Sequence, residues 1–291
     1  MTAVQQQIWS GTDFPYQCLV DTKRTEAFRA AILASVKPGD IVLDAGSGSG
    51  ILAFFAAEAG AKTVLAVEID PFLAACLERS VQANGLSSTI QVICGNVCSV
   101  PLPQGVDVFI SEMLDTGLMD EMQAVVVNQL RAQEIINDKT RMIPARYDTF
   151  VELGAARLDY YGYRILMPKH SWPHYAIEHN GWLPVHFEAA TEPALIATTD
   201  FHARLATDVE QILSFPARPL RREINALRIS GHVHLTANSS LRATNAFNGD
   251  KILPIEPFTI HDGQSIRAAL QYTLGAGLSS LHIQTLCEPS P

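Results

Sequence analysis

Hydrophobic and polar positions along the first part of the chain recur at helical and strand spacing in turn. In residues 25–33 apolar side chains return at the spacing of a helix, and Pro38-Gly39-Asp40 breaks the pattern. A short apolar run at 41–44 leads into a glycine-rich stretch at 45–50 and good helix formers at 51–59. This order predicts a helix, then a strand, a tight loop and a second helix.

The same alternation continues further along. Apolar runs predict strands at 63–69, 90–93 and 106–110, and a helix is predicted at 71–84. Strands that alternate with helices favour parallel βαβ units with right-handed crossovers. We therefore expect an α/β, Rossmann-like domain with a doubly wound sheet.

The pattern changes after Ile143-Pro144, where the βαβ rhythm stops. Runs typical of strands, separated by Gly and Pro, lie at 147–153, 226–236, 258–261 and 265–272. We place a domain boundary near residue 145. Residues 1–145 would then hold the N-terminal helices and the Rossmann-like domain, and residues 146–291 a mainly antiparallel, β-barrel-like domain.

Composition and charge narrow the classes of protein to consider. Apolar residues are 47% of the 291 residues and charged residues 18%, which suffices for packed cores and argues against disorder. The formal net charge of -9 argues against a surface that grips nucleic acid. Since no apolar run reaches about 18 residues and no basic segment opens the chain, we expect neither a membrane span nor an export signal.

The cysteines are odd in number and lack metal-ligand spacing, and no carboxylate-histidine pair on a predicted helix has such spacing either. We therefore expect reduced thiols in the cytoplasm and no metal site. The five cysteines are Cys18, Cys76, Cys94, Cys98 and Cys287.

Three glycines mark the loop after the first predicted strand. Gly46, Gly48 and Gly50 form the pattern G-x-G-x-G, where a turn without side chains lets a nucleotide-like ligand approach closely. A dinucleotide fingerprint would have its third glycine at the position of Ile51, so a pyrophosphate ligand is disfavoured. Glu68 ends the next strand and can accept hydrogen bonds from both ribose hydroxyls, which predicts an adenosine pocket. A structural turn with a solvent-facing acid is the alternative.

Two neighbouring segments extend this pocket. Asp44 stands beside the glycines, where its carboxylate could orient backbone N–H groups or meet the cationic end of a cofactor; a helix-capping or turn aspartate is the alternative. The turn Gly95-Asn96-Val97-Cys98 follows the third predicted strand, where contact with adenine is expected.

Two glutamates flank a loop at the carboxyl edge of the predicted sheet. The strand at 106–110 delivers Glu112 to this edge, where open α/β folds bind ligands, and Glu121 follows nine positions later across a loop that contains Gly117. Two carboxylates can clamp a planar cation, and either can accept an N–H proton or stabilise developing positive charge. The alternative for Glu121 is a helix-start or surface acid.

These motifs together resemble the protein arginine methyltransferase family, whose double-glutamate loop has the same interval at the same place. The resemblance covers roughly residues 19–150 and includes the segment 19–25 before the sheet. It implies S-adenosylmethionine as cofactor, a C-terminal β-barrel and a head-to-tail homodimer built through an arm in that barrel. The implied catalytic residues are Glu112 and Glu121, and the implied cofactor-binding residues are Arg24, which pairs with the cofactor's carboxylate, with Asp44, Gly46, Gly48, Gly50, Glu68, Asn96, Val97 and Cys98.

Three departures from the family pattern bear on the function. Met113-Leu114 replaces the family's Trp-Met after the first glutamate, and Cys98 replaces an acid that contacts adenine. The Thr-His-Trp loop that closes the family's arginine slot has no counterpart, since residues 244–250 contain neither His nor Trp. A shared fold therefore does not carry over the substrate.

We expect a methyltransferase for a small nitrogen-containing metabolite, such as a guanidine, an amine or an indole of secondary metabolism. With an indole, a carboxylate bonded to the ring N–H would favour methylation at carbon 3. A protein arginine methyltransferase with a divergent barrel is the rival enzyme, and a non-catalytic partner subunit is the alternative of another class. Retention of Arg24, Glu68 and both loop glutamates argues against that subunit. An aromatic-rich segment at 160–182 could form a dimer arm or a lid over the acceptor.

Overall fold

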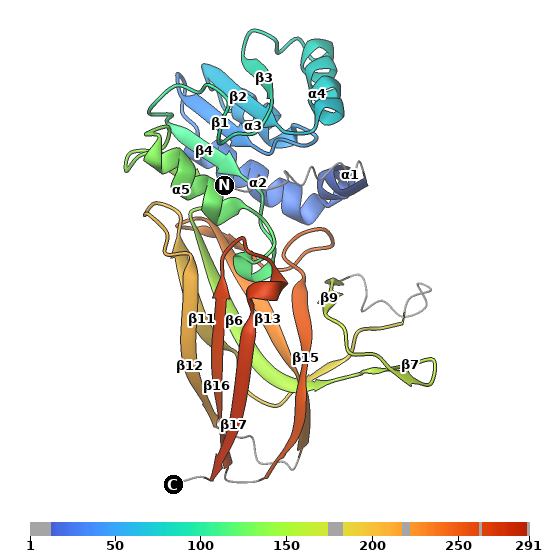
Figure 1. The fold of residues 1–291 in the computed structure, drawn as a ribbon. Coiled ribbons are helices and arrows are strands. Elements are labelled where there is room, and N and C mark those ends of the chain that lie inside the picture. The colour runs from blue at the N-terminus through green and yellow to red at the C-terminus, as the bar shows by residue number, and fades with distance from the viewer. Residues whose placement is uncertain (1–12, 174–182, 217–221, 262–263, 290–291) are drawn as a thin grey trace.

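The chain folds into two stacked parts. The computed structural model describes residues 13–173, 183–216, 222–261 and 264–289 (Figure 1). A parallel sheet with its helices forms one part, and long antiparallel strands form the other. The elements at the junction place the loops considered below.

Two helices open the described chain. They are α1 (Asp13–Val20) and α2 (Thr22–Ser35). Asp21 caps α2, because its Oδ1 accepts a hydrogen bond from the Arg24 backbone N–H at 3.2 Å. Phe28 and Ile32 bury the inner face of α2 in the core, which confirms the helix expected over residues 25–33.

The first sheet contains five parallel strands in the order β3-β2-β1-β4-β5. These strands are β1 (Ile41–Ala45), β2 (Thr63–Glu68), β3 (Ile90–Cys94), β4 (Val108–Ser111) and β5 (Arg141–Ile143). Three helices accompany them: α3 (Ile51–Glu58), α4 (Pro71–Ala83) and α5 (Gln123–Ala132). The central strands β1, β2 and β4 are almost wholly buried, as apolar runs in a covered parallel sheet should be. The expected α/β, Rossmann-like class is confirmed.

Two details of this sheet differ from the sequence expectation. The connection from β3 to β4, residues 95–107, contains no helix, so the βαβ rhythm lapses there. The strand expected from residue 106 begins at Val108, because Asp107 uses its side chain to accept a hydrogen bond from the Ile41 backbone N–H at 2.8 Å. β5 is too short to leave a periodic signal.

The second part is antiparallel throughout its described pairings. One sheet has the order β10-β6-β13-β15-β9, with β11 beside β6 and β14 beside β13; a second has the order β12-β16-β17. The long strands are β6 (Arg146–Ala156), β11 (Ala194–Asp200), β12 (Asp208–Pro216), β13 (Arg222–Thr236), β15 (Asp250–Ile260), β16 (Gln264–Thr273) and β17 (His282–Pro289). The short elements are β7 (Asp159–Tyr160), β8 (Tyr163–Arg164), β9 (Lys169–Ser171), β10 (Phe187–Ala189), β14 (Ser239–Leu241), and the 3-10 turns η1 (Thr116–Leu118) and η3 (Leu278–Ser280).

Four of these strands were expected, and one is longer than its sequence indicates. Prolines at 254 and 257 interrupt the pattern, so only residues 258–261 read as a strand. β15 nevertheless starts at Asp250, and the register against β13 shifts between Ile224 and Ala226 to accommodate the interruption.

One hydrophobic core connects the two parts. Leu153 and Ile229 of one antiparallel sheet, Ile266 and Leu270 of the other, and Val108 of the parallel sheet all belong to the same buried cluster. The cis peptide bond Ile143–Pro144 lies between β5 and β6, where the chain passes from one part to the other. Among the described helices, none has the length and apolar character needed to cross a membrane.

An arm extends from the second part at β7 and β8 (Figure 1). We use "arm" for residues 159–167, which carry the exposed apolar side chains Tyr161, Tyr163, Ile165, Leu166 and Met167. The arm forms the start of the aromatic-rich segment 160–182, whose residues 174–182 lie outside the described part of the chain.

Candidate functional site

The glycine loop between β1 and α3 is a backbone cradle. Gly46, Gly48 and Gly50 have φ values of 71°, 53° and 81°, in the left-handed region that only glycine adopts readily. The backbone N–H groups of Gly46 and Ser47 both donate to the Val67 carbonyl, at 2.9 and 3.0 Å, which fixes the loop against β2. A side chain at Gly50 would overlap Leu77 of α4. The loop therefore needs its glycines for both conformation and space.

Glu68 lies at the end of β2 under this loop. Its Oε2 accepts a hydrogen bond from the Gly48 N–H at 2.7 Å, and its Oε1 accepts one from the Asp70 N–H at 2.9 Å. Each carboxylate oxygen has a second lone pair, so Glu68 can still accept from ribose hydroxyls. Asp70, which the sequence reading missed, caps α4 by accepting from the N–H groups of Phe72 and Leu73.

The turn after β3 reaches the same edge. The Gly95 N–H donates to the Glu68 carbonyl at 2.9 Å, which ties the turn to the end of β2. Asn96 folds its side chain back to accept from the Cys98 N–H at 2.9 Å, and Val97 is buried. Burial raises the pKa of the Cys98 thiol, so this position presents an uncharged apolar surface rather than an acid.

Asp44 is buried beside the glycine loop and retains an unsatisfied oxygen. Its side chain is 1% exposed, and its Oδ2 has no hydrogen-bond partner among the described residues. Burial raises the pKa of Asp44 to about 7, and nearby Glu68 acts in the same direction. Such an oxygen is a receptor for a ligand N–H or cation, because an unpaired buried acceptor is otherwise costly.

Arg24 of α2 lies against Glu112, the residue after β4. The Arg24 Nη2 and Glu112 Oε2 form a short ion pair, and Arg24 Nη1 donates to the Cys18 carbonyl at 3.3 Å. Burial raises the pKa of the Glu112 carboxyl, and Arg24 opposes that shift. Arg24 Nε has no partner among the described residues, which leaves one guanidinium donor available.

Glu121 lies at the far end of the acceptor loop, for which we take residues 112–121. Its backbone N–H donates to Asp115 Oδ1 at 3.0 Å, whereas its carboxylate makes no hydrogen bond or ion pair to any described residue. Burial and the nearby charges of Glu112 and Asp115 raise the pKa of Glu121 well above its usual value. The structure thus brings both predicted glutamates into one partly buried group, and among the described residues only Glu112 has a cation bonded to it.

Gln123, at the start of α5, holds the beginning of the acceptor loop. Its Oε1 accepts from the Ser111 hydroxyl at 2.9 Å and from the Met113 N–H at 3.2 Å. The residues on both sides of Glu112 are therefore fixed by one buried amide. Polar residues are common at the start of a helix, so the sequence did not indicate this contact of Gln123.

The antiparallel part holds the middle of the same loop. Tyr147 of β6 accepts a hydrogen bond from the Gly117 N–H at 3.0 Å and donates to Asn248 Oδ1 at 2.6 Å. Lys251 of β15 is 1% exposed and pairs with both Asp115 and Asp120. Sequence patterns did not indicate these side chains, because the partners lie 30 to 136 positions apart.

Residues 244–250 lie beside the acceptor loop and α1. The Ala246 N–H donates to Asp21 Oδ2 at 2.8 Å, and the Ala246 carbonyl faces Cys18 Sγ at 3.7 Å. Cys18 is close enough to Glu112 and Glu121 for their charges, added to burial, to raise its pKa to about 12. The segment thus contacts α2's cap and α1 through the Ala246 backbone, while the indole of Trp172 packs against Gly249.

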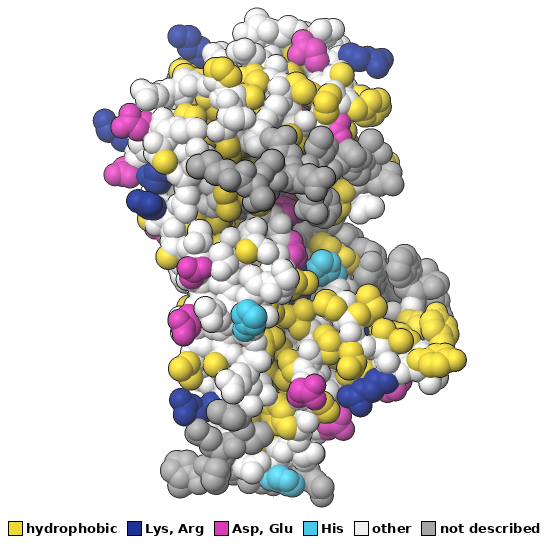
Figure 2. All heavy atoms as spheres, in the orientation of Figure 1, with side chains coloured by type: hydrophobic (Ala, Val, Ile, Leu, Met, Phe, Trp, Pro, Cys, Tyr) yellow, Lys and Arg dark blue, Asp and Glu magenta, His cyan; other side chains and the backbone are white. Residues whose placement is uncertain are grey.

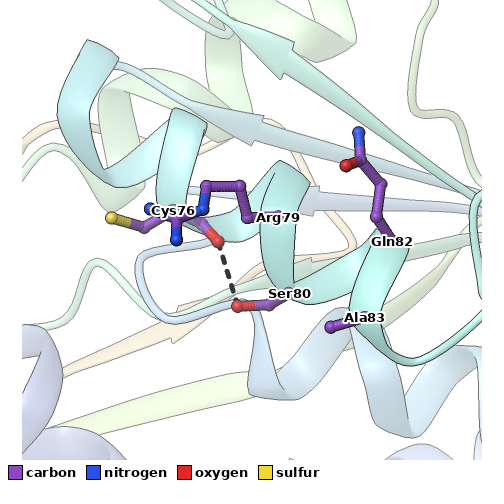
Figure 3. Close-up of a pocket in the computed structure, with 5 residues that line it drawn as sticks. All are labelled: Cys76, Arg79, Ser80, Gln82 and Ala83. Atoms are coloured by element: carbon purple, nitrogen blue, oxygen red, sulfur yellow. Dashed lines mark hydrogen bonds between the residues drawn. The ribbon is translucent and has the colours of Figure 1, made fainter.

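A surface hollow elsewhere is unrelated to this group. Its lining comes from α4 alone, where the Ser80 hydroxyl donates to the Cys76 carbonyl at 2.9 Å (Figure 3). No glycine, aspartate or glutamate of the sheet edge lines it. Across the described residues, no group of three or more His, Cys, Asp or Glu side chains is arranged to hold a metal ion.

The residues at the sheet edge fit a nucleoside that carries charged groups. The glycine loop offers close backbone approach and Glu68 offers ribose acceptors, while Asp44 Oδ2 and Arg24 Nε are unpaired polar atoms of opposite charge preference. An amino acid attached to the nucleoside would satisfy both of those atoms. Next to them, the two buried carboxylates can receive an N–H group of a second molecule.

A family model described as ribosomal protein L11 methyltransferase (PrmA) matches residues 24–156. The chain is 26% identical to "Uncharacterized protein MJ1452" of Methanocaldococcus jannaschii over 272 residues, which cover 92% of this chain and 95% of that protein. It is 37% identical to the histone-arginine methyltransferase CARMER of Culex quinquefasciatus over 133 residues, 45% of this chain but 22% of that protein. The chain thus spans about a fifth of that methyltransferase.

Two solved structures share the fold over nearly the whole chain. The PRMT1 enzyme-prozyme heterotetrameric complex of Trypanosoma brucei, solved with AdoHcy, superposes with a TM-score of 0.69 at 20% identity and covers 94% of this chain and 96% of its own. Protein arginine methyltransferase 10 of Arabidopsis thaliana superposes with a TM-score of 0.70 at 18% identity, with the same coverage of both chains.

Proposed function

We propose that this chain, an S-adenosylmethionine-dependent methyltransferase with the fold of the protein arginine methyltransferases, methylates a nitrogen of a small cationic metabolite. The observation that carries the proposal is the partly buried Glu121 carboxylate, which has no bonded partner among the described residues and lies close enough to Glu112 to feel its charge. A guanidine or protonated amine supplies the positive charge and the N–H donors that this pair lacks.

The cofactor is assigned to the sheet edge. The glycine loop and Glu68 would hold its adenosine, with Val97 and Cys98 along the base. Asp44 and Arg24 would hold its amino and carboxylate groups, since these side chains carry the unpaired polar atoms. When bound, the cofactor supplies an electrophilic methyl group on positively charged sulfur.

The protein's own task is to present a nitrogen lone pair and to receive a proton. Glu112, held by Arg24, orients an N–H group of the acceptor. Glu121 would take a proton from the cationic nitrogen, which frees the lone pair that forms the new nitrogen–carbon bond while the carbon–sulfur bond of the methyl donor breaks. Burial raises the pKa of Glu121, so its ionised carboxylate binds a proton more strongly than an exposed one.

The choice of a small acceptor over a peptide arginine rests on residues 244–250. This segment contains neither His nor Trp, and the indole that packs against it is that of Trp172, which follows β9 and lies against Gly249. An indole is the neutral alternative, and it would use one carboxylate for its N–H. A protein arginine substrate, as named for CARMER, is the rival, and the match to that relative covers 45% of this chain.

The proposal is tested by incubating the purified chain with cofactor labelled on the methyl group and three acceptor sets. These are a panel of guanidines and amines, a panel of indoles, and arginine-rich peptides. We expect labelling of a guanidine or amine and none with the Glu121→Gln variant. Efficient peptide labelling would replace the small acceptor by the rival, and labelling of indoles alone would remove the cationic class.

Calorimetry with S-adenosylmethionine tests the non-catalytic alternative. The Trypanosoma brucei relative is an enzyme-prozyme heterotetrameric complex, in which a second kind of subunit accompanies the enzyme. We expect binding, because Arg24, Glu68 and the glycine loop are all in place. A chain that binds no cofactor, alone or with acceptor present, would be a partner subunit.

We further infer that the arm joins two copies of the chain into a homodimer. Figure 2 shows apolar side chains gathered on the side of the second part from which the arm extends. Leu166 is 62% exposed, and four other apolar side chains of the arm, Tyr161, Tyr163, Ile165 and Met167, are exposed as well. Sedimentation of Leu166→Asp should show monomers, whereas Ile212→Asp, at an equally exposed position of β12, should stay dimeric.

The unpaired state of Cys18, Cys76, Cys94 and Cys98 supports a cytoplasmic location.

A further inference from the structure

We propose that Lys251 is a positioning residue for methyl transfer, which holds the backbone that carries Glu121 and places a positive charge beside that carboxylate. Lys251 belongs to β15 of the antiparallel part, and its sequence neighbourhood gave no sign of a link to the acceptor loop. The proposal rests on the function proposed above for Glu121.

Lys251 is buried, and its ammonium group is paired with two carboxylates. Its Nζ donates to Asp115 Oδ2 through a short contact and to Asp120 Oδ2 at 2.6 Å. An ammonium group buried without such partners would be strongly destabilising. The two aspartates of the acceptor loop therefore make it possible for β15 to bury a lysine.

Asp115 links Lys251 to the backbone of Glu121 through hydrogen bonds. While its Oδ2 accepts from Lys251, its Oδ1 accepts from the Glu121 N–H at 3.0 Å. Asp120, next to Glu121, also accepts from the Leu278 N–H at 3.1 Å, so η3 holds the same end of the loop. Rotation of the Asp115 carboxylate would move the Glu121 backbone with it.

Charges around Glu121 are mostly of its own sign. Glu112, Asp115 and Asp120 all face it and raise its pKa, and Lys251 is the cation that lowers it. Cys18 lies on the α1 side with a pKa raised to about 12, so it contributes no charge there. His170 of β9 pairs with Lys251 across the sheet, and burial together with the nearby lysine lowers the pKa of His170. Without Lys251, therefore, Glu121 should stay protonated to higher pH, so that a smaller fraction is ionised and able to accept a proton near neutral pH.

Neutral contacts on the same loop separate anchoring from charge. Tyr147 and Asn248 fix Gly117 through hydrogen bonds that involve no ionic group. Tyr147→Phe removes an anchor of the loop without changing its charge. Lys251→Met removes the charge, with a side chain of similar length. A structural role for Lys251 predicts that the two variants behave alike, whereas the positioning role predicts that only Lys251→Met alters the titration of Glu121.

The first experiment follows the Glu121 carboxyl by NMR on the full chain labelled with carbon-13 at glutamate, and Glu121→Gln identifies the signal. We expect its midpoint in Lys251→Met to lie at higher pH than in the unsubstituted chain, by about one unit for one close charge removed. Tyr147→Phe and the exposed-site control Lys62→Met should leave the midpoint unchanged. An unchanged midpoint in Lys251→Met overturns the proposal.

Asp120→Asn is the second variant, and it covers the case in which Lys251→Met does not fold. It removes a negative charge that faces Glu121 at a half-buried position, and it leaves Lys251 paired with Asp115. The Glu121 midpoint should then shift to lower pH, opposite to Lys251→Met. A shift to higher pH, or none, contradicts the charge arrangement.

Kinetics with the acceptor identified above complete the test. Lys251→Met should lower kcat about tenfold near neutral pH, equivalent to one unit in the pKa of the base. The acidic limb of its pH profile should move to higher pH, and the KM for the cofactor should stay unchanged. If the NMR midpoint moves but no nitrogen compound is methylated, the proposed function fails and the role of Lys251 stands. If methylation occurs without either shift, the role of Lys251 fails alone.

Discussion

The glycine loop and the acceptor loop lie at the same edge of one sheet, but they are held in different ways. Gly48 reaches Glu68 across 20 positions of sequence, so the glycine loop is built within its own βαβ unit. The acceptor loop is held by Tyr147, Gly249 and Lys251, and the contact between Asp115 and Lys251 spans 136 positions. The cofactor side is a local structure, whereas the acceptor side exists only once the second part has folded against it.

The largest expected effect breaks the acceptor side alone. Glu121→Gln should lower kcat by about a hundredfold or more, since removal of a general base typically has that effect. Cofactor affinity should stay unchanged, because Glu121 is bonded to nothing on the cofactor side. Single-turnover assays beside calorimetry measure the two quantities, and a large loss of cofactor binding would show that the sides are not separable.

A second prediction concerns the cofactor side and pH. The Asp44 pKa of about 7 lies above the 3.8 of an unfolded aspartate, so the folded chain binds the extra proton between these values. The free energy of unfolding should therefore fall as pH rises from about 4 through about 7, by at most about 4 kcal/mol from this group. Asp44→Asn should lack that part of the slope. Denaturant titrations of both chains across this window, without cofactor, would contradict the prediction if their slopes were parallel.

The glycines sharpen the cofactor side further. Gly50→Ala combines left-handed strain with overlap on Leu77 and should destabilise the chain by about 3 kcal/mol. Gly48→Ala meets Pro15 only at 3.6 Å, an ordinary contact, so strain alone remains and about 1 kcal/mol is expected. Thermal unfolding of the pair gives the comparison. Equal losses would mean that the space against Leu77 is unimportant.

The smallest expected effect loosens the acceptor loop without altering charge. Tyr147→Phe removes the hydrogen bonds to Gly117 and Asn248 and should destabilise the chain by about 1 kcal/mol. Acceptor KM should rise while the cofactor dissociation constant stays the same. A higher cofactor dissociation constant with an unchanged acceptor KM would contradict the prediction, because it would show that Tyr147 acts on the cofactor side.

Sequence patterns identified the cofactor side because its determinants are short-range. Gly46, Gly48 and Gly50 come directly after a buried strand, and Glu68 ends the next one, so spacing alone indicated their common edge. Glu112 and Glu121 were predicted from their interval, and they lie close enough for the charge of Glu112 to add to burial in raising the pKa of Glu121; their catalytic role stays a prediction. The pairing of Arg24 with Glu112 was not expected, since the resemblance directed Arg24 toward the cofactor.

The acceptor side could not be read in the same way. Lys251 follows Asp250 in a strand interrupted by prolines, and a charged side chain at such a place resembles a solvent-facing residue. Asp115 and Asp120 resemble ordinary loop acids for the same reason. Their meaning depends on a register between β15 and the loop that no local period encodes. The same holds for Tyr147, which a periodic reading assigns only to the core.

The ion pair between Lys251 and the two loop aspartates also constrains how this protein can change by descent. If the antiparallel half were replaced by one without a cation at the position of Lys251, Asp115 and Asp120 would lose their partner, and a parallel half without these aspartates would leave the lysine unpaired. A viable exchange of halves therefore needs both partners of this ion pair, which lie on opposite sides of the Ile143–Pro144 bond.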